Sequence, residues 1–154
     1  MLRHDAPEKI LVLHGPNLNL LGQREPHIYG TMTLEQLNER LRSLAAKVQV
    51  QLVIVQSNHE GALIDALHKH MGEVAGAIIN PAGLTQYSVS LHDCIKTMPF
   101  PVVEVHLSNL AAREQWRHHS IISSAARGTV QGLGWRSYTA ALRTLVEIVR
   151  EKHK

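Results

Sequence analysis

The sequence predicts an α/β fold in which helices cover both faces of a five-stranded parallel sheet. Short apolar runs of strand length recur five times along the chain. Segments with apolar residues at helical spacing separate these runs. Strands that are buried on both faces are near-continuous apolar runs, and the alternation of strands with helices is typical of parallel sheets.

The expected strands end at recognisable turn signals. They span residues 10–13, 50–55, 75–79, 102–107 and 128–133. The first is followed by His14-Gly15-Pro16 and the third by Asn80-Pro81, both of which favour a turn.

The expected helices begin at capping residues. Thr33 and Gln36 form the pattern of a capping box before an apolar face that runs through residues 34–48. Asn58 is the expected cap of a helix through residues 62–67, and Ser88 starts a helix that ends before Pro99. Residues 111–118 predict a helical turn or two, and residues 138–149 carry the apolar face of the closing helix.

A chain of 154 residues suits one domain, here residues 1–154. For so short a chain we expect the flavodoxin-like strand order 2-1-3-4-5, which gives a three-layer sandwich. In such sheets ligands bind beyond the carboxyl ends of the strands, where the strand order reverses. The loops after strands one, three and four are therefore the candidate site.

Composition and charge argue against several classes of function. The formal charge of +3 favours anionic ligands mildly, and no basic block indicates a nucleic-acid surface. No apolar run approaches the length of a membrane span, and the amino terminus lacks the apolar segment of a signal peptide. The single cysteine, Cys94, excludes an internal disulfide and fits a reducing compartment. We expect a cytoplasmic protein.

Residues 14–33 form a long connection between a strand and its helix, and loops of this length are usually functional. Within it, Arg24 is permanently charged and could stabilise Tyr29 as a phenolate, which is a plausible general base. The alternative is purely structural: Gly15-Pro16-Asn17 is a turn, and the leucines that follow pack the loop against the sheet.

The third and fourth strands also end in polar residues. Small residues at 80–83 can bring backbone N–H groups close to an anion, although a tight turn explains them equally well. Glu104 and His106 lie two apart, so in a strand they point to the same side. A carboxylate that orients an imidazole prepares His106 as a general acid; a strand-end histidine with a solvated neighbour is the plain alternative. Ser108 and Asn109 then add hydrogen-bond donors.

A basic segment follows, with Arg113, Arg117, His118 and His119. Such a run is usually a solvated face, but here an arginine could bind a carboxylate. No spacing typical of a metal, dinucleotide or P-loop site occurs. Gly132 and Gly134 more plausibly serve close packing, and Cys94 is more plausibly a buried apolar residue than a nucleophile.

Four stretches in this order resemble the type II dehydroquinase family: GPNLNLLGQREPHIYG, QSNHEGALID, INPAGLTQYSVSLHD and EVHLSN…REQWRHHS. The resemblance runs from about Lys9 to Glu147. It implies a flavodoxin-like fold, a dodecamer built from trimers, and neither a metal nor an organic cofactor. It further implies conversion of 3-dehydroquinate to 3-dehydroshikimate by anti elimination through an enolate, in aromatic biosynthesis or in quinate breakdown.

The resemblance also implies residue roles. Tyr29 would take the proton next to the ketone, with Arg24 keeping it anionic, and Asn17 would hold a water at the enolate oxygen. His106 would protonate the departing hydroxyl, with Glu104 orienting it. The substrate contacts expected are Asn80, Gly83, Gln86, Asp93, Leu107, Ser108 and Arg117, of which Asp93 would reach the site of a neighbouring subunit.

One stretch departs from the family pattern. Gln86 and Tyr87 stand where the family usually has His and Thr. An amide exchanges hydrogen bonds but carries no charge, so the change bears on substrate affinity. It leaves a non-catalytic anion-binding relative as the alternative function. A flavin- or phosphate-binding module is suggested by the fold alone, but no phosphate loop follows strand one.

Overall fold

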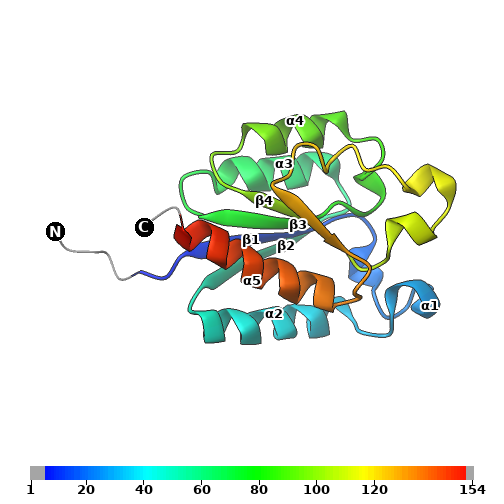
Figure 1. Ribbon diagram of the computed structural model, residues 1–154, viewed down its shortest axis with the longest axis horizontal. Coiled ribbons are helices and arrows are strands. Elements are labelled where there is room, and N and C mark those ends of the chain that lie inside the picture. Colours follow the sequence, from blue (N-terminus) through cyan, green and yellow to red (C-terminus); the bar gives the residue numbers. More distant parts are fainter. Residues whose placement is uncertain (1–5, 152–154) are drawn as a thin grey trace.

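The computed structural model describes residues 6–151 as one parallel sheet between two layers of helices (Figure 1). The strand order is β2-β1-β3-β4-β5, and every neighbouring pair is parallel. This confirms the predicted fold class and order. The strands are β1 (Lys9–His14), β2 (Gln51–Gln56), β3 (Gly76–Asn80), β4 (Val102–His106) and β5 (Gly128–Gln131).

Two helices cover each face of the sheet (Figure 1). Helices α2 (Leu34–Val48) and α5 (Arg136–Glu151) lie on one face, and α3 (Glu60–Lys69) and α4 (Val89–Thr97) on the other. The remaining short elements are η1 (Leu18–Leu20), α1 (Pro26–Tyr29), η2 (Ala82–Leu84), η3 (Leu110–Ala112) and η4 (Gln115–Arg117). None of the helices within residues 6–151 is both long and apolar enough to cross a membrane.

The core is divided by the sheet because successive side chains of a strand point to opposite faces. In β1, Ile10 and Val12 pack towards α2 and α5, whereas Leu11 and Leu13 pack towards α3 and α4. All four are fully buried. This two-sided burial explains why the strand appears in the sequence as a continuous apolar run.

Two of the three predicted caps are confirmed. Thr33 and Gln36 form the complete capping box of α2, and the Ser88 hydroxyl accepts from Leu91 N–H. The prediction for Asn58 was wrong, because the cap of α3 is His59, which makes no side-chain capping bond. Asn58 Oδ1 instead accepts from Asn17 N–H at 2.9 Å and holds the loop after β1.

The remaining differences lie near the site. Residues 110–117 form the two 3-10 turns η3 and η4, and β5 ends two residues earlier than expected. Strand β5 stops where Gly132 adopts a positive φ of 86°. A side chain there would come within 3.0 Å of Asn109 Cβ, so Gly132 does serve close packing.

Candidate active site

A cavity of about 120 Å³ opens beyond the carboxyl ends of β1, β3 and β4. Helix α1 and the η3–η4 segment lie at this end of the molecule, opposite the two termini (Figure 1). Ten of the twelve predicted site residues line the cavity. They are Asn17, Arg24, Tyr29, Asn80, Gly83, Gln86, His106, Leu107, Ser108 and Arg117.

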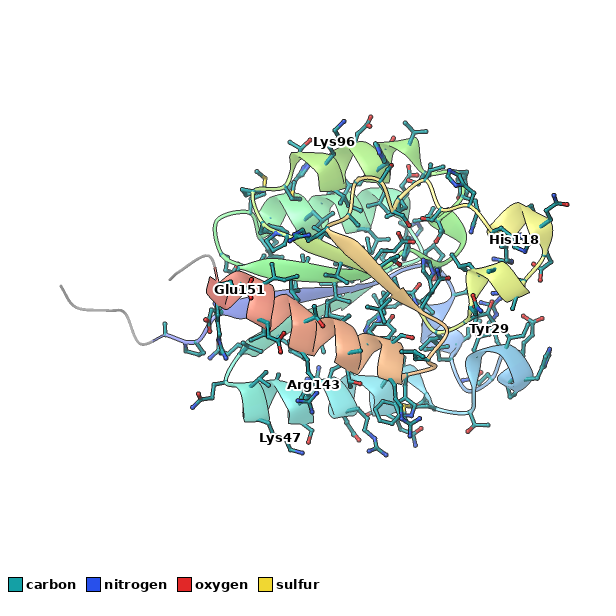
Figure 2. The ribbon with its side chains drawn as sticks, viewed as in Figure 1. Tyr29, Lys47, Lys96, His118, Arg143 and Glu151 are labelled. Carbon is teal, nitrogen blue, oxygen red and sulfur yellow. The ribbon has the colours of Figure 1, made fainter. Side chains whose placement is uncertain are left out.

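The loop after β1 positions Tyr29 at the end of α1, facing the η3–η4 segment (Figure 2). Pro26 occupies the first turn of this short helix, where its missing N–H costs nothing. Gly30 ends the helix at a φ of 82°, a conformation that glycine adopts readily. Turns at both ends thus hold the phenol at the cavity.

Two arginines flank the Tyr29 ring. The guanidinium carbons of Arg24 and Arg113 each lie 5.3 Å from its centre. Arg24 also makes a 4.0 Å ion pair with Glu25, but both side chains are well exposed and the pair is weak. Arg113 lines the same cavity, and its side chain is only 10% exposed. Arg113 was not among the predicted site residues, because a run of basic residues does not reveal which of them turns inwards.

His106 and Glu104 point to the same side of β4, as predicted, and are hydrogen-bonded through His106 Nε2. Glu104 is fully buried and does not line the cavity; it lies behind His106. The hydroxyls of Ser123 and Ser120 donate to its two oxygens at 2.6 and 2.8 Å. Nothing in the sequence marked these two serines, which belong to the irregular segment before β5.

The Glu104 carboxyl is held in its charged form. Burial by itself would raise its pKa, but the hydrogen bond and the positive charge of His106 oppose this, as do the two serine hydroxyls. The net effect is a lowered pKa. A buried carboxylate in contact with His106 Nε2 orients the ring and stabilises an imidazolium, leaving Nδ1 for a ligand.

The loop after β3 supplies amide and backbone groups. Asn80 is almost fully buried, and its Oδ1 accepts from Ala82 N–H at 3.1 Å. Ala82 has a positive φ of 50°, so this bond stabilises a strained turn. Gly83 follows at the cavity wall, where a Cβ would meet nothing within 4 Å. The small residues of this loop thus form the turn η2, well before α4 begins, and anion binding by their N–H groups stays a prediction.

Gln86 and Arg117 are joined across the cavity wall. Gln86 Nε2 donates to the Arg117 carbonyl oxygen at 3.1 Å, while its buried Oε1 has no hydrogen-bond partner among residues 6–151. The Arg117 guanidinium pairs with Glu114 at 2.6 Å. Ser108 Oγ accepts from Arg113 at 3.3 Å. The cavity therefore concentrates three guanidinium groups, which suits a ligand with a carboxylate.

Asp93 is the other predicted residue that does not line this cavity. Its carboxylate, on α4, is 71% exposed and contacts His92 at 3.1 Å. Among residues 6–151, no group of three or more His, Cys, Asp or Glu side chains is placed to bind a metal ion.

Comparison with known proteins identifies the family. A family model described as dehydroquinase class II matches residues 8–146. The chain is 49% identical to a 3-dehydroquinate dehydratase of Herpetosiphon aurantiacus, over 90% of this chain and 96% of the relative. It is 51% identical to that of Roseiflexus castenholzii, over 90% of this chain and 88% of the relative. The crystal structure of a type II dehydroquinase from Propionibacterium acnes superposes with a TM-score of 0.88 at 38% identity, covering 91% of this chain and 97% of that one. This chain therefore belongs to the dehydroquinase class II family.

Proposed function

We propose that Tyr29 is the base and His106 the acid with which this chain eliminates water from 3-dehydroquinate. As a member of its family, the chain is a hydro-lyase with type II 3-dehydroquinate dehydratase activity. The observation that carries the residue assignment is that the Tyr29 phenol, flanked by two guanidiniums, and the Glu104-backed His106 face one cavity.

The first step is proton removal by the Tyr29 phenolate. Arg24 and Arg113 place two fixed positive charges beside the ring, and these stabilise negative charge on the phenolate oxygen. The phenolate takes the proton from the carbon between the ketone and the carbon that carries the departing hydroxyl. The C–H electron pair moves towards the ketone oxygen, which becomes an enolate.

Asn17 stabilises the enolate in this proposal. It lines the cavity with a positive φ of 67°, and its backbone is held by Asn58. Its carboxamide would hold a water that donates to the enolate oxygen. Fixed donors aimed at developing charge are often the largest single catalytic contribution.

The second step expels the hydroxyl. The enolate re-forms the ketone, its electrons form the carbon–carbon double bond, and the hydroxyl leaves with the proton of the His106 imidazolium as water. Glu104 stabilises that imidazolium before the transfer. Tyr29 has gained a proton and His106 has lost one, so exchange with solvent restores both groups.

The remaining cavity residues bind the substrate. The three guanidiniums favour an anion, and Arg117 and Ser108 would hold its carboxylate. Asn80, the backbone at Gly83 and Leu107, and Gln86 would contact its hydroxyls. Because Gln86 Nε2 is bound to Arg117, we assign Gln86 to positioning Arg117 as much as to direct contact.

We also propose a dodecamer built from trimers, in which Asp93 reaches the cavity of a neighbouring copy. In support, Asp93 is exposed on α4 and outside the cavity of its own chain. Tyr87 and Val89, on either side of the Ser88 cap of the same helix, are 67% and 62% exposed, which suits burial by another subunit. We propose the cytoplasm as its location, where the free thiol of Cys94 stays reduced.

The deciding experiment is an ultraviolet assay of the purified chain with 3-dehydroquinate, following the conjugated enone. We expect turnover that borohydride leaves unchanged, because the proposed route forms no lysine Schiff base. Inactivation by borohydride in the presence of substrate would contradict the route through Tyr29 and His106.

A further inference from the structure

Two amide side chains at the end of the edge strand β2 hold the loop that follows β1. Gln56, the last residue of β2, donates from Nε2 to the Gly15 carbonyl oxygen at 3.2 Å. Asn58 Oδ1 accepts from Asn17 N–H at 2.9 Å and from Gln56 Nε2 at 3.2 Å. The two amides therefore bind main-chain groups on both sides of Pro16, where the loop lines the cavity.

The main chain fixes the orientation of both amides. The Gly15 carbonyl oxygen can only accept, so the nitrogen and not the oxygen of the Gln56 amide faces it. The Asn17 N–H can only donate, so Asn58 presents its oxygen. Both orientations agree with the bond from Gln56 Nε2 to Asn58 Oδ1, so each donor in this set meets an acceptor.

Asn17 depends on this support because its backbone lies in the left-handed region, with a φ of 67°. Its carboxamide makes no capping bond to η1, so the main chain determines where the carboxamide lies in the cavity. The Asn17 carbonyl oxygen accepts from Leu20 N–H at 3.0 Å, which fixes the peptide group that follows Asn17. The bond to Asn58 fixes the peptide group that precedes it. Because φ and ψ are the only soft torsions between these two planar groups, the two bonds together restrain both torsions.

We propose that Asn58, supported by Gln56, is a positioning residue that holds the Asn17 carboxamide where negative charge develops on the enolate oxygen. The inference rests on the proposed function in one respect, the contact of Asn17 with the enolate through a water. Asn58 is exposed and does not line the cavity, so it acts through Asn17 and not by touching the substrate. A donor that is displaced from the developing charge stabilises the transition state less, so the loss of Asn58 affects kcat.

The test is a double-mutant cycle on the steady-state kinetics of the assembled enzyme with 3-dehydroquinate. Asn58→Ala should lower kcat about three- to tenfold and change KM by less than about twofold, since the enolate charge develops only in the transition state. Asn17→Gly removes the carboxamide, and glycine adopts the positive φ without strain, so this variant should lower kcat at least as much. In the double variant, kcat should equal that of Asn17→Gly, because Asn58 acts only through the Asn17 carboxamide.

Asn58→Asp is the conservative variant, because a carboxylate oxygen accepts from Asn17 N–H and Gln56 Nε2 as the amide oxygen does. Solvent screens the added charge at this exposed position, so kcat should return to within about twofold of the wild type. Ser57→Ala is the matched control, because the Ser57 hydroxyl makes the same kind of bond to a different target, accepting from His59 N–H at 3.0 Å. It should lower the thermal midpoint as Asn58→Ala does and leave kcat unchanged.

A wild-type kcat in Asn58→Ala overturns the inference, as do effects of Asn58→Ala and Asn17→Gly that simply multiply. A kcat as low in Asn58→Asp as in Asn58→Ala overturns it too. If Asn58→Ala does not fold, Gln56→Met removes the donor that supports Asn58, and a wild-type kcat there overturns the inference instead. A wild-type kcat in Asn17→Gly would remove the proposed enolate contact itself. Loss of the base assignment would show separately, as activity retained in Tyr29→Phe.

Discussion

The Arg113 guanidinium carbon lies 5.3 Å from the centre of the Tyr29 ring, at the same distance as that of Arg24. Tyr29 and Arg113 come from loops that follow different strands, and only the fold brings them together. Two guanidinium groups therefore lie beside the proposed base, whereas its own loop supplies only that of Arg24. Because the Arg113 side chain is 10% exposed and that of Arg24 36%, solvent screens the charge of Arg113 less.

Replacing Arg113 should therefore slow catalysis. We expect Arg113→Gln to lower kcat about 10- to 100-fold, since one of two charges that stabilise the phenolate is lost. Arg113→Lys should recover part of that loss. Arg136→Gln is the matched control, because the Arg136 guanidinium lies 4.5 Å from the Trp135 ring, outside the cavity around Tyr29. Equal kcat values for Arg113→Gln and the wild type would remove Arg113 from the mechanism.

Replacing Tyr29 should stop turnover without unfolding the protein. Tyr29→Phe keeps the ring and its contacts with both arginines but removes the oxygen that accepts the proton. We expect kcat to fall by at least about 100-fold, with an unchanged circular dichroism spectrum and thermal midpoint. His27→Gln, at an exposed position of the same short helix that does not line the cavity, is the control. Activity within severalfold of normal in Tyr29→Phe would contradict the proposed base.

The two serines behind Glu104 should matter for catalysis although neither lines the cavity. Ser123→Ala removes a 2.6 Å hydrogen bond to the Glu104 carboxylate, so the carboxylate is held less firmly and positions the His106 ring less well. We expect kcat to fall about fivefold, in line with one hydrogen bond to a charged group. Ser124→Ala, in the next, exposed residue, should have no effect. A kcat equal to that of the wild type in Ser123→Ala would show that Glu104 needs no such support.

His14 should make the stability of the fold depend on pH. Its pKa is about 4 in the folded chain and about 6.5 when unfolded, so between these values the unfolded chain binds more protons. The free energy of unfolding should therefore fall as the pH drops through this window, by about 3 kcal/mol in total from this group. Urea unfolding at a series of pH values measures it. His14→Gln should flatten the profile in this window, whereas substitution of the exposed His68 should not.

Much of the fold could be predicted because its determinants are local. The capping box of Thr33 and Gln36 needs four consecutive residues, and the burial of Ile10 to Leu13 on both sides of the sheet leaves a continuous apolar run in the sequence. At Asn58 the local pattern was not sufficient, and the predicted cap was wrong. Two capping positions are adjacent there, and the bond to Asn17 that decides between them comes from another loop.

The contacts of the candidate site also fall into those that the amino-acid order indicates and those that only the folded chain makes. The amino-acid order alone puts Glu104 and His106 on one side of a strand, because a period of two is a property of any strand. It also placed Arg24 and Tyr29 in one long loop. The packing of loops and helices around the sheet, by contrast, brings Arg113 to that pair, two serines to Glu104, and Tyr138 to His14. Side-chain contacts between distant segments leave no periodic pattern in a sequence, since their geometry depends on how the helices and loops pack around the sheet.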